Sequence, residues 1–245
     1  MTYPKLASMK KKLVIIGGGG HCRSVIDSVC SLSVYSEIVI TDPNISVGEK
    51  INGYSVVGGD EVLYNLYDNG YDSAFIAIGA IGDTDVRRKL DKIVTDIGYK
   101  FPIIVDASAT IALNCMIADG TYIAKNACVN SSSSIGRNAI INTGAIVEHD
   151  CNIGDYVHIA VGAVVCGGCN IGHDVFIGAN ATVIQGVTVG ENSIIGAGST
   201  VLADVPANTT VVGVFSRGGV VLALLFRLLY FYILLYYLKL MSELA

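Results

Sequence analysis

The sequence lacks an excess of basic residues, because its 245 residues include 16 Lys and Arg against 21 Asp and Glu, a formal net charge of −5. A nucleic-acid-binding surface needs clustered positive charge, so the composition argues against recognition of a phosphate backbone. A secretory leader is not expected either, because residues 1–12 are largely polar and the apolar run that follows covers only residues 13–16. We therefore expect a cytoplasmic protein.

Two short motifs are incomplete. Cys166 and Cys169 have the spacing of a redox or zinc pair, but no second pair follows them, so we predict structural cysteines and no metal site. The glycine run 17–20 lacks the third glycine of a dinucleotide fingerprint, whose place is taken by Cys22 or Arg23 depending on the frame. Hydride transfer on NAD is therefore not expected.

The sequence does contain a strict six-residue repeat. Ile or Val occupies every sixth position from Ile111 to Val201 without a break. Six residues suit one short strand and a corner, and three such sides close a coil of eighteen residues. The repeat predicts an all-β parallel β-helix of five coils with these side chains inward. An antiparallel sandwich would instead show turn signals every eight to twelve residues and no fixed register.

A different pattern precedes the repeat. Strands are predicted over residues 11–16, 37–41 and 73–78, with a glycine turn after the first strand and a helix from Ser24. Strand, glycine turn, helix and strand indicate a small parallel α/β, Rossmann-like unit over residues 11–104. Such turns bring backbone N–H groups to a phosphate, so we expect a nucleotide or nucleotide-sugar here, although a plain turn and strand end would look the same. The predicted contacts are Gly18, Gly19, Gly20, His21, Asp42 and Gly79.

Several motifs together resemble a known family. They are the strand followed by GGGGH, Asp42-Pro43, residues 77–79, Phe101-Pro102 and the segment NTGAIVEHDC at 142–151. Over residues 11–214 this combination resembles the sugar acetyltransferases of the left-handed β-helix superfamily. The most similar groups are the sialic acid O-acetyltransferases and the UDP-4-amino-sugar N-acetyltransferases of bacillosamine synthesis. The resemblance implies a left-handed coil, acetyl-CoA as co-substrate, and a homotrimer with active sites between neighbouring β-helices.

The resemblance also implies a catalytic pair. Direct acetyl transfer requires a base for the attacking amine or hydroxyl, and histidine is the side chain whose ordinary pKa lies near neutrality. His149 stands where the family has its catalytic histidine, and Asp150 resembles its acidic partner, with Glu148 as the competing carboxylate. Adjacent strand residues point to opposite faces, so a partner next in sequence works only at a corner or bulge.

The acetyl-CoA contacts implied by the resemblance are His158, Gly167 and Ala197. Gly167 lies eighteen residues, or one coil, after His149, so a residue without a side chain would line a groove beside the histidine. We interpret His173 as a solvated corner residue.

Three functions remain open at this point. The first is acetyl-CoA-dependent N-acetylation of an amino sugar or nucleotide-sugar in surface glycan biosynthesis. The second is O-acetylation of sialic acid or another sugar, which the same histidine would serve. The third is a non-catalytic β-helix scaffold, which would need no histidine beside a groove.

The predicted domains are an N-terminal extension at 1–10, the Rossmann-like domain at 11–104, the β-helix acetyltransferase domain at 105–214 and a hydrophobic C-terminal tail, expected to be helical, at 215–245. Residues 220–238 contain Arg227 as their one charge, and as a helix they would be about 28 Å long, close to the thickness of a bilayer. Membrane association is the favoured interpretation of this segment. A packed cap on the β-helix or trimer, or a segment without a role, are the alternatives.

Overall fold

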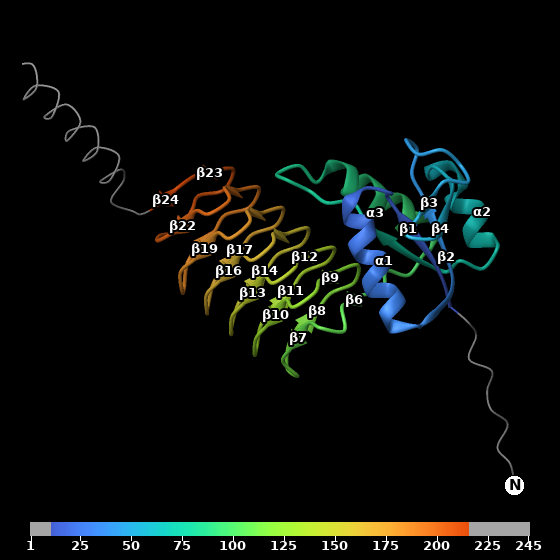
Figure 1. Cartoon of the computed structure of the whole chain (residues 1–245). Coiled ribbons are helices and arrows are strands. Elements are labelled where there is room, and N and C mark those ends of the chain that lie inside the picture. Colours follow the sequence, from blue (N-terminus) through green and yellow to red (C-terminus); the bar gives the residue numbers. More distant parts are fainter. Residues whose placement is uncertain (1–10, 216–245) are drawn as a thin grey trace, which may run out of the picture.

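The structure is a computed structural model that describes residues 11–215. Figure 1 shows an α/β domain packed beside the first coils of an elongated β-helix, whose last coils extend away from it. The predicted tail at 220–238 lies outside the described residues. The α/β domain and the parallel β-helix agree with the fold class expected from the sequence.

The N-terminal domain is a five-stranded sheet in the order β3-β4-β2-β1-β5, in which only the β3–β4 pair is antiparallel. The predicted strand at 73–78 is two residues too long, because the chain leaves the sheet after Ile76 and crosses to the β-helix. The helix expected from Ser24 begins four residues earlier, directly on the glycine run. The elements are β1 (Lys11–Ile16), α1 (Gly20–Leu32), β2 (Tyr35–Thr41), β3 (Lys50–Ile51), β4 (Tyr54–Gly58), a 3-10 turn (Asp60–Val62), α2 (Leu63–Asp68), β5 (Ser73–Ile76) and α3 (Asp85–Ile97).

The alternating side chains of β1 give this sheet two buried faces. Leu13 and Ile15 pack with α1 and with Tyr122 of the β-helix, whereas Val14 and Ile16 pack with α2 and α3. Helix α1 therefore lies between the sheet and the β-helix, and one apolar cluster crosses the domain boundary (Figure 1). This shared core fixes the two domains against each other.

The β-helix has three faces, each a parallel sheet of two-residue strands. The first face contains β6 (Ile104–Val105), β9 (Tyr122–Ile123), β12 (Ile140–Ile141), β15 (His158–Ile159), β18 (Phe176–Ile177), β21 (Ile194–Ile195) and β23 (Thr210–Val211). The second face contains β7 (Thr110–Ile111), β10 (Cys128–Val129), β13 (Ile146–Val147), β16 (Val164–Val165), β19 (Thr182–Val183), β22 (Thr200–Val201) and β24 (Val214–Phe215). The third face contains β8 (Met116–Ile117), β11 (Ser134–Ile135), β14 (Asn152–Ile153), β17 (Asn170–Ile171) and β20 (Thr188–Val189).

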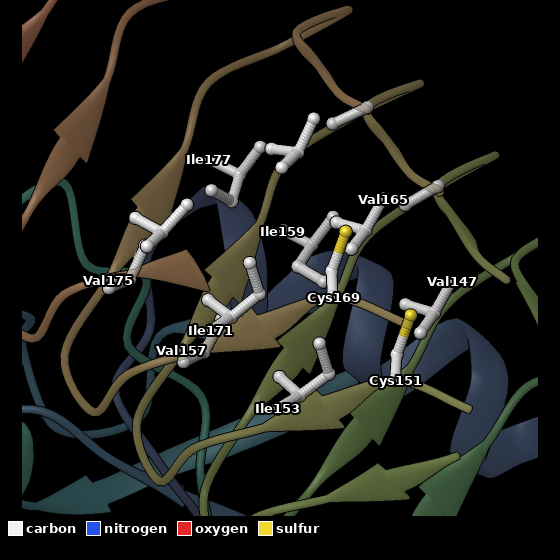
Figure 2. Packing of buried hydrophobic residues seen from close by; sticks show 14 of the residues in the cluster. Val147, Cys151, Ile153, Val157, Ile159, Val165, Cys169, Ile171, Val175 and Ile177 are labelled. Carbon is white, nitrogen blue, oxygen red and sulfur yellow. The ribbon is translucent and has the colours of Figure 1, made fainter. Parts of the chain in front are cut away.

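The predicted inward side chains form the core of the β-helix. Figure 2 shows Ile153, Ile159 and Val165 from the three faces of one coil pointing inward, with equivalent residues stacked on the next coil. Cys151 and Cys169 are buried in this stack, which agrees with the interpretation of Cys169 as a structural residue. All seven cysteines are free thiols. The expected five coils are too few, because two of the faces contain seven strands. Val105 continues the register one step earlier, and shortened spacings after Val201 add the last strands.

Candidate active site

The corner between the second and third faces contains the predicted catalytic pair. His149 and Asp150 follow β13, and Asp150 has a φ of 58°. This left-handed corner conformation, which Asp tolerates better than most residues, brings its carboxylate back to the neighbouring ring. Asp150 Oδ2 lies 2.8 Å from His149 Nδ1. The condition that adjacent residues pair only at a corner is therefore met.

Glu148 has different partners. Its Oε2 accepts hydrogen bonds from the Asn130 amide at 3.0 Å and from the backbone N–H of His149 at 3.3 Å. Asp150 is thus the carboxylate at the imidazole, and Nδ1–H donates to it when the ring is neutral. That arrangement leaves Nε2 with a free lone pair, which is the form that a general base requires.

Gly167 lies one coil beyond His149, directly beside the imidazole. A Cβ at this position would be 2.6 Å from both Cε1 and Nε2 of the ring. The absence of a side chain is therefore what lets the ring occupy this place, as the eighteen-residue spacing predicts. Contact of Gly167 with acetyl-CoA remains a prediction.

The catalytic pair is open to solvent in a single protomer. The side chains of His149 and Asp150 are 62% and 64% exposed. Ala197 lies at the corner between the first and second faces, so the width of the second face separates it from His149. One protomer therefore does not bring these two predicted site residues together.

His158 lies on the first face, where the N-terminal domain covers it. Its Nδ1–H donates to the Ala80 carbonyl at 2.8 Å, and its Nε2 accepts from the Asn142 amide at 3.1 Å. The amide orientation is consistent, because Asn142 Oδ1 accepts the Thr143 N–H at 2.8 Å. Burial lowers the pKa of His158 to about 4, so the ring is neutral at pH 7. Its predicted contact with acetyl-CoA remains untested.

The predicted nucleotide-sugar residues gather at the carboxyl edge of the N-terminal sheet, where β1, β2 and β5 end side by side. Asp42 accepts the Gly18 N–H at 2.7 Å and the Asn44 N–H at 2.8 Å, so its carboxylate shapes the loop. A Cβ added to Gly19 or Gly20 would meet no atom within 4 Å, so open space adjoins the start of α1. Gly79 follows β5 at the same edge.

His21 turns away from that edge and toward the β-helix. Its ring packs edge-on against Tyr122 with 5.4 Å between centroids. Burial, with smaller effects of His158 and Arg87, lowers the pKa of His21 to about 3. The ring is therefore neutral and lies at the domain interface, and a substrate contact for it remains a prediction.

Three features of the site have no counterpart in the sequence predictions. Asn142 belongs to the quoted motif, but its bond to His158 depends on stacking across coils. The Ala80 carbonyl and the pairing of Arg88 with Asp174 bring together residues far apart in the chain. The stacking of the coils and the interface between the domains are needed to reveal them.

Within residues 11–215, no group of three His, Cys, Asp or Glu side chains lies close enough to hold a metal ion. Among the helices of this same range, none is long and apolar enough to cross a membrane.

His173, interpreted as solvated, is 55% exposed at its side chain and accepts the backbone N–H of Asp155.

The fold and the site together define a hexapeptide-repeat transferase with an added α/β domain. Residues 12–94 match the family described as the PglD N-terminal domain. Residues 168–203 match the family described as bacterial transferase hexapeptide with six repeats. The two matches fall on the two domains of the structure.

Solved structures agree with this class. A His-to-Asn mutant of perosamine N-acetyltransferase from Caulobacter crescentus, in complex with CoA and GDP-perosamine, is 35% identical, with a TM-score of 0.76 over 82% of this chain and 93% of that one. The acetyltransferase domain of PglB from Neisseria gonorrhoeae FA1090, in complex with acetyl coenzyme A, is 32% identical, with a TM-score of 0.78 over 83% and 97%. The chain therefore belongs to the left-handed β-helix family of sugar acetyltransferases, as its motifs predict.

A curated relative extends the comparison. GDP-perosamine N-acetyltransferase from Escherichia coli O157:H7 is 29% identical over 150 residues, which are 58% of this chain. The chain matches 64% of that relative's length, slightly under two thirds.

Proposed function

We propose that the protein transfers the acetyl group of acetyl-CoA to the amino group of a nucleotide-linked amino sugar. The observation that carries this proposal is the His149–Asp150 pair beside Gly167. It is supported by similarity to a perosamine N-acetyltransferase solved with CoA and GDP-perosamine and to an acetyltransferase domain solved with acetyl coenzyme A. The names of those relatives favour an amine over a hydroxyl as the acceptor. O-acetylation of a sugar and a non-catalytic scaffold are the outcomes that the experiment below separates.

The geometry suggests a simple course for the reaction. The sugar nitrogen forms a bond to the thioester carbon, and the bond from that carbon to sulfur breaks. His149 Nε2 takes the proton that the nitrogen loses, while Asp150 holds Nδ1 and stabilises the imidazolium. The proton then passes to the leaving thiolate, so the products are an N-acetyl sugar and CoA with a free thiol.

We further infer that the working enzyme is a homotrimer. The catalytic pair is exposed in one protomer, and Ala197 lies at the opposite edge of the second face. A neighbouring copy placed against this face would exclude water from the imidazole of His149. It would also bring an edge of its own β-helix next to that imidazole. Sedimentation analysis tests this inference, and a fully active monomer would contradict it.

The decisive experiment is a screen of amino and hydroxy sugars, free and nucleotide-linked, with acetyl-CoA and detection by mass spectrometry. We expect an N-acetylated nucleotide-sugar and at least a hundredfold slower reaction for His149→Asn, the usual scale of general-base loss. Undiminished turnover in His149→Asn would remove this residue from the mechanism. Acetylation of hydroxyl groups alone would favour the O-acetyltransferase, and no binding of acetyl-CoA would favour the scaffold.

A further inference from the structure

A short strap, residues 80–84, crosses the first face of the β-helix between β5 and α3. At one end the Ala80 carbonyl accepts Nδ1–H of His158 at 2.8 Å. At the other end Thr84 Oγ1 donates to Asp174 Oδ1 at 2.5 Å. Between them Gly82 has a φ of 73°, and a Cβ there would lie 2.4 Å from Ile194 Cδ1. The strap is therefore held at both ends and packed closely in its middle.

Asp174 is the anchor of the strap. It sits at a corner with a φ of 60°, and its side chain is only 13% exposed. Besides Thr84 it binds the Arg88 guanidinium through both oxygens, with Nε 3.1 Å from Oδ1. The Arg88 guanidinium also stacks 4.2 Å from the centroid of the Tyr156 ring. A bidentate pair stacked on an aromatic ring is a rigid arrangement.

His158 depends on the strap for one of its two hydrogen-bond partners. Asn142, the other partner, belongs to the β-helix, as does Phe176, whose ring lies edge-on at 5.3 Å between centroids. Only the Ala80 carbonyl comes from the N-terminal domain, and its place follows from where the strap is tied. A movement at Thr84 would therefore shift the acceptor of the imidazole proton.

We propose that the linkage of Thr84, Asp174 and Arg88 positions His158. By holding the strap, it keeps the Ala80 carbonyl on Nδ1–H and so sets the orientation and tautomer of the ring. Its catalytic consequence rests on the proposed function together with the predicted contact of His158 with acetyl-CoA. Its structural consequence, an ordered imidazole proton, can be measured without any activity.

The test uses the full chain labelled with 15N-histidine, which has only four histidines to assign. Asp174→Gly removes the carboxylate and keeps a residue suited to positive φ, Asp174→Asn retains an oxygen that can accept from Thr84, and Thr84→Val removes the hydroxyl at nearly constant shape. We expect a slowly exchanging Nδ1–H signal of His158 in the wild type. Exchange should be at least tenfold faster in Asp174→Gly and Thr84→Val, with partial rescue in Asp174→Asn. The turnover number should fall about tenfold in Asp174→Gly and Thr84→Val, and by less in Asp174→Asn.

Asp91→Ala is the matched control. Asp91 lies further along α3 and accepts the Arg137 guanidinium at 2.7 Å and the Tyr156 hydroxyl at 2.5 Å, so it also ties this helix to the β-helix. Its loss should lower the melting temperature as much as Asp174→Gly does, with the His158 proton and the turnover number unchanged. An unchanged exchange rate in Asp174→Gly, or an equal effect of Asp91→Ala, would overturn the proposal. If the wild type acetylated no sugar, the proposed function would fail while the exchange rates still decided the positioning role.

Discussion

The variant Gly167→Ala tests whether the position of the His149 imidazole determines the rate of acetyl transfer. The added Cβ would lie 2.6 Å from Cε1 and Nε2 of His149, whereas ordinary carbon contacts begin near 3.4 Å. The ring must therefore retreat by about 0.8 Å, and it can do so because the His149 side chain is 62% exposed. Backbone strain plays no part, since Gly167 does not have a positive φ.

A misplacement of about 1 Å costs on the order of a hundredfold in rate, equivalent to about 2.7 kcal/mol of transition-state stabilisation. We therefore expect the turnover number of Gly167→Ala to fall roughly a hundredfold, with the melting temperature almost unchanged. Release of the CoA thiol under saturating sugar and acetyl-CoA measures the turnover, and unfolding by heat measures the stability.

Gly186→Ala, at the same corner of the next coil, is the opposite case. Gly186 has a φ of +71°, and a Cβ there would meet nothing within 4 Å. This variant should lose about 1–2 kcal/mol of stability to left-handed strain and retain its turnover number. Wild-type turnover in Gly167→Ala, or a crystal structure of that variant with the His149 ring in place, would refute the reasoning.

Further predictions concern carboxylates and buried histidines. Asp150→Asn should lower the turnover number about a hundredfold or more, whereas Glu148→Gln, which keeps an acceptor for its two donors, should cost less than tenfold in the same assay. Burial lowers the pKa values of His21 and His158 from 6.5 to about 3 and about 4, so the unfolded chain binds more protons and the free energy of unfolding should decrease as pH falls below about 6.5. Denaturant titrations across pH would show this loss, and a flat profile would contradict it. Although burial raises the pKa of Asp106, its hydrogen bonds outweigh that effect and hold the pKa below the ordinary 3.8, so its stabilisation is lost as pH falls through the acidic range, and Asp106→Asn should flatten that part of the profile.

The inward side chains of the β-helix could be predicted from the sequence because every coil has to bury aliphatic residues at equivalent positions. Each coil needs one inward aliphatic residue on each of its three sides. The six-residue spacing alone therefore predicts that Ile153, Ile159 and Val165 are buried. The register also identifies residues 149 and 150 as a corner, whereas their pairing as base and carboxylate was implied by the family resemblance. The number of coils was underestimated because the register begins one step earlier, at Val105, and because the spacing shortens after Val201.

The partners of His158 could not be predicted in the same way. Asn142 approaches it across a coil boundary, and Ala80 arrives from another domain through a backbone carbonyl that has no sequence signature. The inward turn of His21 has the same origin, because its neighbour Tyr122 belongs to the β-helix. Contacts that depend on how two domains dock require the structure.

The three faces of the β-helix share one inward repeat but differ in their outward side chains. Its period constrains the inward side chain of each strand and leaves the outward one free. On the first face the outward residues Tyr122, Ile140 and His158 are buried under the N-terminal domain. On the third face short polar residues border a groove of about 570 Å³. Docking of the N-terminal domain thus covers His158 and its neighbours on the first face, whereas the His149 side chain at the edge of the second face is 62% exposed in one protomer.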